Sequence, residues 1–543
     1  MKVESHRQKE AAMRYLRAVR RFADGVLSQG RDAYGAYSTP LFVDGLNPRS
    51  GEPVVWRVEG QTWTLSNLAS QQVLLRTLDG LSALTGESRY RQAAEEAQAY
   101  AFARLRHGRL LSWGGHMAYD LERKNSVYAP DKGPVHELKC HFPYYDLMWR
   151  VNPEQTMTYI DAMWESHITN WDNLEFSRHG RPLEQSVGHR IWERPYQHLP
   201  VFFTARGLTF INAASDLVYA AAMLHHLSGD DKPLRWAKRL QERYVEARDA
   251  KTGISGYQYS RSVLPGPGGR GDRAEHQFGE QLAAHHPTEA TLLVSRQVRT
   301  IVARSSVNKL RLAERLGSAG EAFGRWASQD LLALAEYSYD VEDSSFHPIL
   351  TNGLRLTNLS LDRSGYYGAR GERLAPMRAG WEMLWPYLMA YRLTSDPRFL
   401  PYIHQMSRAG GLDFGQPPEE TPAGVSSDPL ELLCLLEWHA CTEEPGWLAL
   451  AVQSGEQILK ERFHYGYFLP SSSHRYAKFD ALEPLALLHL AANLLGRAEV
   501  VPDYPGSSAF FGSAYEDLGH KIDNQWIYGQ RLLEEGGGQN RDL

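Results

Sequence analysis

The pattern that decides the fold is WEMLWPYLMAYRLTSDPRFLPYIHQMSRA, residues 381–409. An apolar helical run, Trp381–Leu393, ends in a polar turn at Thr394-Ser-Asp396, and an amphipathic helix follows over Phe399–Ala409. The Ser, Thr or Asp of such a turn is expected to cap the second helix. Three more pairs of this kind are predicted: Leu65–Leu84 with Tyr90–Leu105, Ser215–Leu227 with Leu234–Ala247, and Pro429–Ala440 with Trp447–Phe463.

The repeated helix pairs indicate whether the chain forms several domains or a single one. A chain of 543 residues would ordinarily form about three to four domains. A helix pair that cannot bury its apolar face alone must stack on its neighbours, however, so the repetition favours one α/α solenoid or closed toroid. We expect this toroid to span residues 1–533, to begin with an amphipathic helix over 6–29, and to leave a Gly-rich, disordered tail at 534–543.

Three segments interrupt the helical pattern. Residues 37–58 contain prolines and glycines that favour an extended chain. Residues 250–287 include the sequence PGPGGRG at 265–271, which predicts a flexible loop that could close over a cleft. Residues 341–377 alternate apolar and polar side chains, which predicts short strands or a long functional loop.

Composition excludes several classes of protein. The net charge is −5 with both signs interspersed, which argues against a nucleic-acid surface. The sequence contains no run of about 18 apolar residues that could span a membrane. Its N-terminal region contains no apolar segment typical of a signal peptide, and three cysteines do not form a disulfide framework. These features predict a protein of the cytoplasm.

Three short motifs carry candidate metal ligands: Trp113-Gly-Gly-His116, Val135-His-Glu137-Leu-Lys139 and Ser177-Arg178-His179-Gly180. Two imidazoles and a carboxylate, here His116, His179 and Glu137, are a usual ligand set for a divalent transition metal. These residues are 21 and 42 positions apart, so only the fold can bring them together.

A zinc protease and ordinary structural roles are the alternatives for the same residues. His136-Glu137-x-x-x-His141 resembles a zinc-protease motif, but that motif places its two histidines four apart rather than five. A single histidine is most often structural, and a lone glutamate usually lies at the surface. The cation of Arg178 next to His179 would weaken metal binding unless an anionic substrate were also present.

Together with Phe142-Pro-Tyr-Tyr145, Gly207-Leu-Thr-Phe-Ile-Asn212 and Gly365-Tyr-Tyr-Gly368, these motifs resemble the pectate lyases of polysaccharide lyase family 2. The resemblance implies an all-α-dominated (α/α)7 barrel with strand-bearing arms beside a deep cleft. It also implies that His116, Glu137 and His179 bind the metal and that Arg178 is the catalytic base. Manganese is the metal that the resemblance implies, although these ligands would also accept cobalt, nickel or zinc.

The implied reaction is β-elimination at a galacturonate, in which a base removes the C5 proton and the 4-oxygen leaves. Arginine is an unusual base because it is ordinarily protonated, so Lys139 is a second candidate, with a carboxylate clamp as its simpler role. The predicted substrate is polygalacturonate or oligogalacturonates, cleaved exolytically. Further predicted substrate contacts are Arg150, Arg355, Arg363 and Arg370.

Two alternatives stay open from the sequence. One is a sugar hydrolase or epimerase on an α/α toroid that uses a carboxylate or histidine pair without metal. The other is a toroid that binds oligogalacturonate without cleaving it. The first alternative leaves His116, Glu137 and His179 without a shared purpose.

Overall fold

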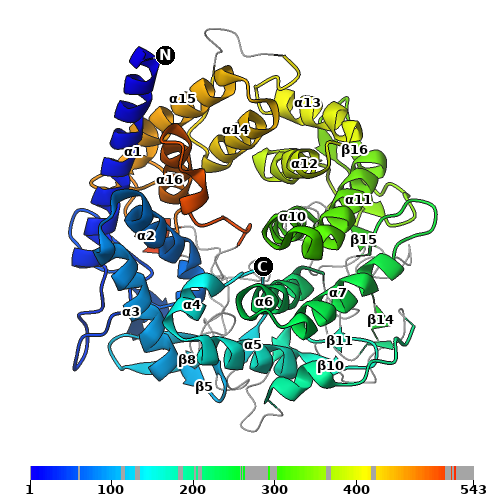
Figure 1. Cartoon of the computed structure of the whole chain (residues 1–543), viewed down its shortest axis with the longest axis horizontal. Helices are drawn as coiled ribbons and strands as arrows, with labels where there is room; N and C mark the ends of the chain where they lie inside the picture. Colours follow the sequence, from blue (N-terminus) through cyan, green and yellow to red (C-terminus); the bar gives the residue numbers. More distant parts are fainter. Residues whose placement is uncertain are drawn as a thin grey trace.

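Helices follow one another around a ring in chain order and alternate between an outer and an inner position (Figure 1). The structure is a computed structural model that describes residues 2–58, 61–111, 117–128, 135–180, 188–200, 204–205, 211–256, 259, 261–262, 292–293, 302–361, 369–416, 424–507, 515–516 and 519–520. The inner helices are α2 (Gln72–Thr85), α4 (Tyr145–Val151), α6 (Ile211–Ser228), α10 (Arg304–Leu316), α12 (Trp381–Thr394), α14 (Pro429–Thr442) and α16 (Glu483–Leu494). The outer helices are α1 (Lys2–Gln29), α3 (Ser88–Arg104), α5 (Pro153–His167), α7 (Asp231–Glu246), α11 (Glu321–Ser338), α13 (Leu400–Ala409) and α15 (Pro445–Arg462). This is the predicted (α/α)7 barrel.

The ring closes between the two ends of the helical region. Helix α1 packs against α16, so the first and last helices are neighbours. The Tyr15 hydroxyl of α1 donates to Glu456 Oε1 at 2.9 Å, and Tyr15 is fully buried. Contacts of this kind leave no free end on the stack of helix pairs. The closed toroid is therefore correct and the open solenoid is wrong.

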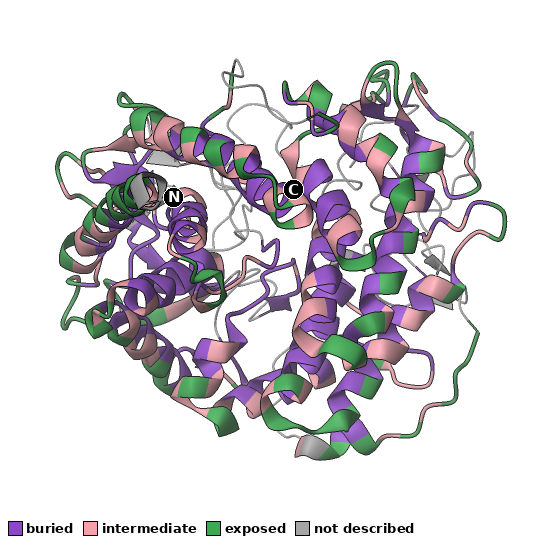
Figure 2. Cartoon of the chain, turned by 45° about the horizontal axis from the view of Figure 1, so that its top comes forward, coloured by how far each residue is buried: buried purple, intermediate pink, exposed green. Residues whose placement is uncertain are grey.

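Inner and outer helices differ in their sequences because they differ in what surrounds them. An inner helix is surrounded by outer helices, by the two adjacent inner helices and by the interior of the barrel, so it must be apolar on most sides. In α14 the five consecutive residues Leu432–Leu436 are all buried. Figure 2 shows the buried residues along the inner ring and the exposed ones on its outer surface. Deleting one such side chain, as in Leu435→Ala, is expected to cost about 2–5 kcal/mol.

Capping of the second helix in each pair was predicted correctly in two of four cases. Asp230 caps α7 by accepting from Lys232 N at 2.9 Å, and Asp396 caps the short 3-10 helix before α13 in the same way. In contrast, α3 and α15 begin after Glu87 and Glu444, which make no side-chain cap. Helix α15 starts with Pro445, which has no N–H to satisfy. The first predicted helix also starts late, at Gln72, because β4 occupies residues 65–66.

Strands are short and lie in the connections between helices. They are β1 (Gly45–Leu46), β2 (Trp56–Val58), β3 (Gln61–Trp63), β4 (Leu65–Ser66), β5 (Arg106–His107), β6 (Leu110–Leu111), β7 (Met117–Asp120), β8 (Asn125–Tyr128), β9 (His136–Glu137), β10 (Ile168–Asn170), β11 (Glu175–Phe176), β12 (His179–Gly180), β13 (Thr204–Ala205), β14 (Arg261–Ser262), β15 (Leu292–Leu293), β16 (Tyr339–Asp340), β17 (Ser345–Phe346), β18 (Ile349–Leu350), β19 (Met377–Arg378), β20 (Phe463–His464), β21 (Tyr467–Phe468), β22 (Ala477–Lys478), β23 (Tyr515–Glu516) and β24 (Gly519–His520).

The strands are concentrated at one rim of the barrel. Hairpins β5–β6, β10–β11, β16–β17 and β20–β21 each follow the C-terminal end of an outer helix. Connections from an inner to the next outer helix are short turns, such as the one after Ser228. Since successive helices run in opposite directions, these hairpins share one rim and the short turns share the other. The strands predicted within 341–377 belong to this set, whereas the loop at 265–271 and the tail at 534–543 lie outside the described residues.

After α16 the chain returns to the centre of the barrel (Figure 1). The Tyr504 ring stacks on Trp385 of α12, with centroids 5.6 Å apart and planes at 6°. Asp503 Oδ2 lies 3.9 Å from Arg315 Nη2 of α10. This segment, residues 501–507, therefore ties the inner helices together across the axis. Within the described residues, no helix has the combination of length and apolarity that a membrane crossing requires.

Candidate metal centre and active site

Strands β9 and β12 bring two of the predicted ligands together. They pair antiparallel with Glu137 opposite His179 and His136 opposite Gly180. Side chains of directly opposite residues lie on the same face of a ladder. Glu137 Oε1 is accordingly 3.5 Å from His179 Nε2. Two motifs that are 42 residues apart in the sequence thus form one site.

Arg178 belongs to the same cluster. Its Nε lies 3.5 Å from Glu137 Oε1, and its carbonyl accepts from Leu138 N at 2.9 Å, which extends the ladder. The Arg178 side chain is 24% exposed and that of His179 is 13% exposed, while that of Glu137 is only 4% exposed. The carboxylate therefore forms the floor of the site, and the guanidinium is its most accessible group.

A chain of buried imidazoles supports this ladder from behind. His136 faces away from Glu137, because adjacent residues of a strand point to opposite sides. Its Nδ1 lies 2.8 Å from Nε2 of His167, the last residue of α5, and its Nε2 lies 3.2 Å from the Tyr159 hydroxyl. His167 Nδ1 in turn lies 2.7 Å from the carbonyl of Ser177. Helix α5 is thereby connected to both strands of the site.

The donor and the acceptor in each of these hydrogen bonds can be assigned, starting from the Ser177 carbonyl. A carbonyl only accepts, so His167 carries its proton on Nδ1 and must accept at Nε2 from His136. His136 Nε2 then accepts from the Tyr159 hydroxyl. Burial lowers the pKa of His136 well below its usual value and that of His167 to about 3, so both rings are neutral. Each ring is held in one tautomer, which fixes its orientation.

Gly180 is where the ladder and the imidazole chain meet. A Cβ added there would lie 2.5 Å from His167 Nε2 and 2.7 Å from its Cδ2. Any side chain would therefore collide with a ring that is fully buried. Glycine at this position lets β12 approach α5 closely, and this approach sets the position of His179.

Asp216 of α6 organises the loop that follows Glu137. Its carboxylate accepts from Cys140 N at 2.6 Å and from Phe142 N at 3.3 Å. Cys140 and Phe142 have φ of 58° and 44°, a left-handed conformation that costs energy for residues with bulky side chains. Burial raises the pKa of Asp216 to about 7, while these backbone N–H groups act in the opposite direction. The inner ring thus holds a strained loop next to the candidate site, with Lys139 at its start.

The residues present fit a divalent metal. Two ligand atoms about 2.1 Å from one ion lie about 3.4 Å apart at a tetrahedral angle. The separation of 3.5 Å between Glu137 Oε1 and His179 Nε2 matches that value. The third predicted ligand, His116, lies outside the described residues, within which no group of three metal-binding side chains occurs. His136 and His141 belong to a strand and a loop, so the zinc-protease arrangement on one helix is excluded.

The predicted substrate residues are distributed more widely. Lys139 is half-buried two residues after Glu137. Arg150 lies near the end of α4, where it forms ion pairs with Asp79 at 3.0 Å and Glu95 at 2.7 Å. These partners give Arg150 a structural role between α4 and its neighbours. Arg355 pairs with Asp340 at 2.8 Å in the β16–β17 arm, Arg370 is exposed, and Arg363 lies outside the described residues.

Sequence reasoning did not find the residues that support the site. Tyr159, His167 and Asp216 come from helices α5 and α6, in positions that look like ordinary polar residues. One signal was available, since Gly180 directly follows a candidate ligand and glycine often marks a close backbone approach. That signal does not identify the ring that it approaches.

Comparisons with known proteins identify the family of this chain. The sequence profile of the family described as periplasmic pectate lyase matches residues 39–514. A pectate disaccharide-lyase of Dickeya dadantii (strain 3937) is 31% identical over 519 residues, which cover 91% of this chain and 93% of that protein.

Solved structures show weaker likeness. A D-mannose isomerase has a TM-score of 0.42 at 12% identity, covering 76% of this chain and 89% of its own. An α-1,6-mannanase of Salegentibacter sp. HEL1_6 has a TM-score of 0.41 at 9% identity, covering 89% of this chain and 99% of its own. The assignment therefore rests on the sequence match, and by that match the chain belongs to the family of periplasmic pectate lyases.

Proposed function

We propose that this protein cleaves α-1,4-linked galacturonate chains by metal-dependent β-elimination and releases 4,5-unsaturated products. The observation that carries the proposal is the pairing of Glu137 with His179 across the β9–β12 ladder, with Arg178 in contact with the same carboxylate. Family membership supports the class of reaction.

The metal would be held by Glu137 and His179 together with His116. When bound, a divalent ion of this kind withdraws charge from a coordinated carboxylate and so favours loss of the neighbouring C5 proton. Manganese, cobalt, nickel and zinc all accept such a ligand set, and manganese is our choice.

Arg178 is the proposed base. It is the most exposed member of the cluster, so a sugar entering from the rim meets its guanidine group before the buried Glu137. In its neutral form a guanidine nitrogen can accept the C5 proton, and the resulting cation then balances the substrate carboxylate. Lys139, half-buried two residues after the end of β9, is our second candidate for the base, and its simpler proposed role is a clamp on the substrate carboxylate.

Two finer proposals concern the product and the compartment. The Dickeya relative is described as a disaccharide-lyase, which supports exolytic release of unsaturated digalacturonate here. The three cysteines are free thiols, which supports a reducing compartment such as the cytoplasm, although the family's description names the periplasm. Short imported oligogalacturonates would be the substrate in that compartment.

Single substitutions test the metal centre. Glu137→Ala and His179→Ala should each lower both bound metal and the rate at which ultraviolet-absorbing product forms from polygalacturonate. His464→Ala, in the β20–β21 hairpin, is the matched control and should leave both unchanged. Full metal occupancy in both site variants would refute the ligand assignment. A wild-type protein that cleaves equally well after chelation would favour the metal-independent alternative, and binding without cleavage under every metal would favour the non-catalytic one.

Viscosity separates the two modes of cleavage. Exolytic release lowers the viscosity of a polygalacturonate solution slowly as ultraviolet absorbance rises, because long chains persist. A steep fall in viscosity at a few per cent of bonds cleaved, with a ladder of long products, would show internal cutting.

A further inference from the structure

Residues outside the β9–β12 ladder form a concave surface. It lies between the end of α3, the β5–β6 hairpin and the turn that joins β7 to β8, and has a cavity volume of about 590 Å³. This volume is within the roughly 300–1,000 Å³ of an ordinary ligand pocket. We call it the Tyr–Arg groove, and define it by Tyr37, Tyr100, Arg104, Arg106, Tyr119 and Arg123.

The groove is cationic on a chain whose net charge is −5. Arg104 and Arg106 are exposed, and neither forms an ion pair within the described part of the chain. Two further cations at the edge of the groove are compensated, since Arg123 pairs with Asp120 at 2.6 Å and Lys124 pairs with a buried aspartate. The unbalanced charge of the groove therefore comes from Arg104 and Arg106.

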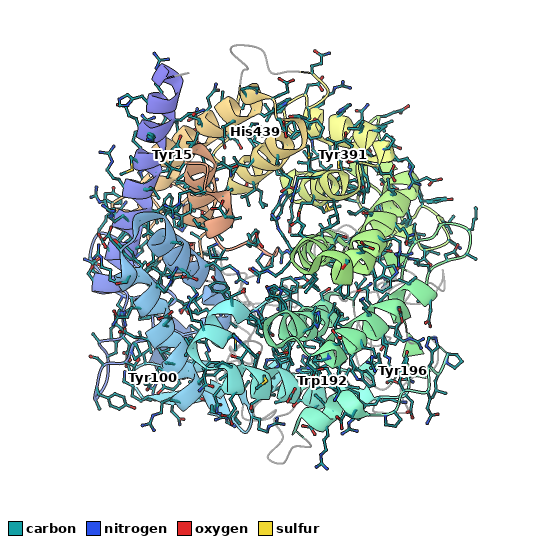
Figure 3. The ribbon with its side chains drawn as sticks, in the orientation of Figure 1. Tyr15, Tyr100, Trp192, Tyr196, Tyr391 and His439 are labelled. Carbon is teal, nitrogen blue, oxygen red and sulfur yellow. The ribbon has the colours of Figure 1, made fainter. Side chains whose placement is uncertain are left out.

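The tyrosines form a wall rather than a stacking platform. Tyr100, on the periphery of the ring (Figure 3), contacts Tyr119 edge to face, with centroids 6.4 Å apart and hydroxyl oxygens 3.3 Å apart. Tyr119 is 4% exposed, so its ring face is covered. The exposed Tyr37 ring is occupied by the Lys124 ammonium at 5.2 Å. Binding of single-stranded nucleic acid relies on open aromatic faces, which these rings do not offer.

We propose that the Tyr–Arg groove binds a stretch of the galacturonate chain at some distance from the bond that is cleaved. This inference rests on the proposed function. Arginine forks match carboxylates in geometry, and a polyuronate presents one carboxylate on every sugar. Tyrosine hydroxyls can bond to sugar hydroxyls. Strand β7, whose turn to β8 borders the groove, begins at Met117, the residue that follows the predicted ligand His116 in the sequence.

The test compares two double variants that remove the same charge. Arg104→Gln with Arg106→Gln removes it from the groove, and Arg17→Gln with Arg325→Gln removes it from exposed positions of α1 and α11. The groove variant loses two surface charge contacts with the substrate, so its KM for polygalacturonate should rise about three- to tenfold. Its kcat/KM for trigalacturonate should stay within about twofold of wild type, because so short a chain occupies only the cleavage site. The control variant should change neither quantity.

A binding measurement without turnover separates this inference from the proposed function. Affinity electrophoresis through gels that contain polygalacturonate should retard the wild type and the control variant more than the groove variant. If the protein binds in this way but cleaves nothing, the groove is supported and the lyase proposal fails. If the protein cleaves polygalacturonate but the two double variants have the same KM and the same mobility in the gel, the groove proposal is wrong. Loss of binding to single-stranded DNA but not to polygalacturonate would overturn it in favour of a nucleic-acid site.

Discussion

Replacing Gly180 with alanine would place a methyl group against the buried ring of His167. The added carbon would lie 2.5 Å from Nε2 and 2.8 Å from Cε1, closer than real side-chain contacts allow. The ring cannot move aside cheaply, since Ser177 O and His136 hold its two nitrogens at 2.7 Å and 2.8 Å. Either the ring leaves these partners or β12 moves away from α5.

The size of the effect follows from the two ways of relieving the contact. Overpacking a buried site costs about 1–3 kcal/mol. Losing one net hydrogen bond of the imidazole chain adds about 0.5–1.5 kcal/mol. Gly180→Ala should therefore reduce the free energy of unfolding by about 2–4 kcal/mol, measured by urea denaturation. It should also reduce metal binding, because a displaced β12 carries His179 with it.

A control and a double variant make this reasoning testable. Gly380→Ala adds the same methyl group where nothing lies within 4 Å, and should cost well under half as much. In a His167→Ala background the ring is absent, so adding Gly180→Ala should change the free energy of unfolding very little. Equal stability of Gly180→Ala and Gly380→Ala, or simple additivity of the two site substitutions, would refute this prediction.

Three further predictions concern other parts of the molecule. Arg178→Ala should lower kcat by about 10²–10⁴ with metal content unchanged; near-normal rates, with a collapse in Lys139→Ala instead, would reverse the two roles. Asp216→Asn should cost about 1–3 kcal/mol in urea, because an amide cannot accept as many N–H groups from the loop at 139–142; unchanged stability would contradict this. Burial lowers the pKa of His489, in helix α16, to about 4. Below pH 6.5 the unfolded chain therefore binds a proton at this histidine that the folded chain does not bind. Stability should fall by about 2 kcal/mol between pH 8 and pH 5 on this account, and His489→Gln should remove that part of the pH dependence; an identical profile would refute it.

The helical ring could be predicted because its determinants are local. Apolar spacing and polar turns recur in residues 65–105, 215–247, 381–409 and 429–463, and each becomes an inner and an outer helix. Helix α4 was missed because its seven residues are too few to show a period. Closure of the ring was predicted correctly, but only from the family resemblance and not from the helix pattern. It depends on α1 meeting α16, a contact between residues more than 400 positions apart that no window of sequence displays.

The candidate site was predicted only as far as its reactive groups. Glu137, Arg178 and His179 stand in motifs that resemble those of a family, and the ladder joins them. Their register could not be predicted, because β9 and β12 have two residues each and no alternation to read. The supports were out of reach for the same reason, since what makes His167 or Asp216 important is a partner supplied by the fold.

Neighbouring helices hold the ligands of the candidate site in place. The strands of the site are two residues long, so their own hydrogen bonds cannot hold Glu137 and His179 in place. Rigidity comes instead from helix α5 through His167 and from helix α6 through Asp216. A substitution in either support should lower activity as a ligand substitution does, but by displacing the ligands. Loss of activity alone therefore does not identify a ligand. A ligand variant keeps the wild-type free energy of unfolding of the metal-free protein and loses metal, whereas a support variant loses both, so the two measurements together distinguish the roles.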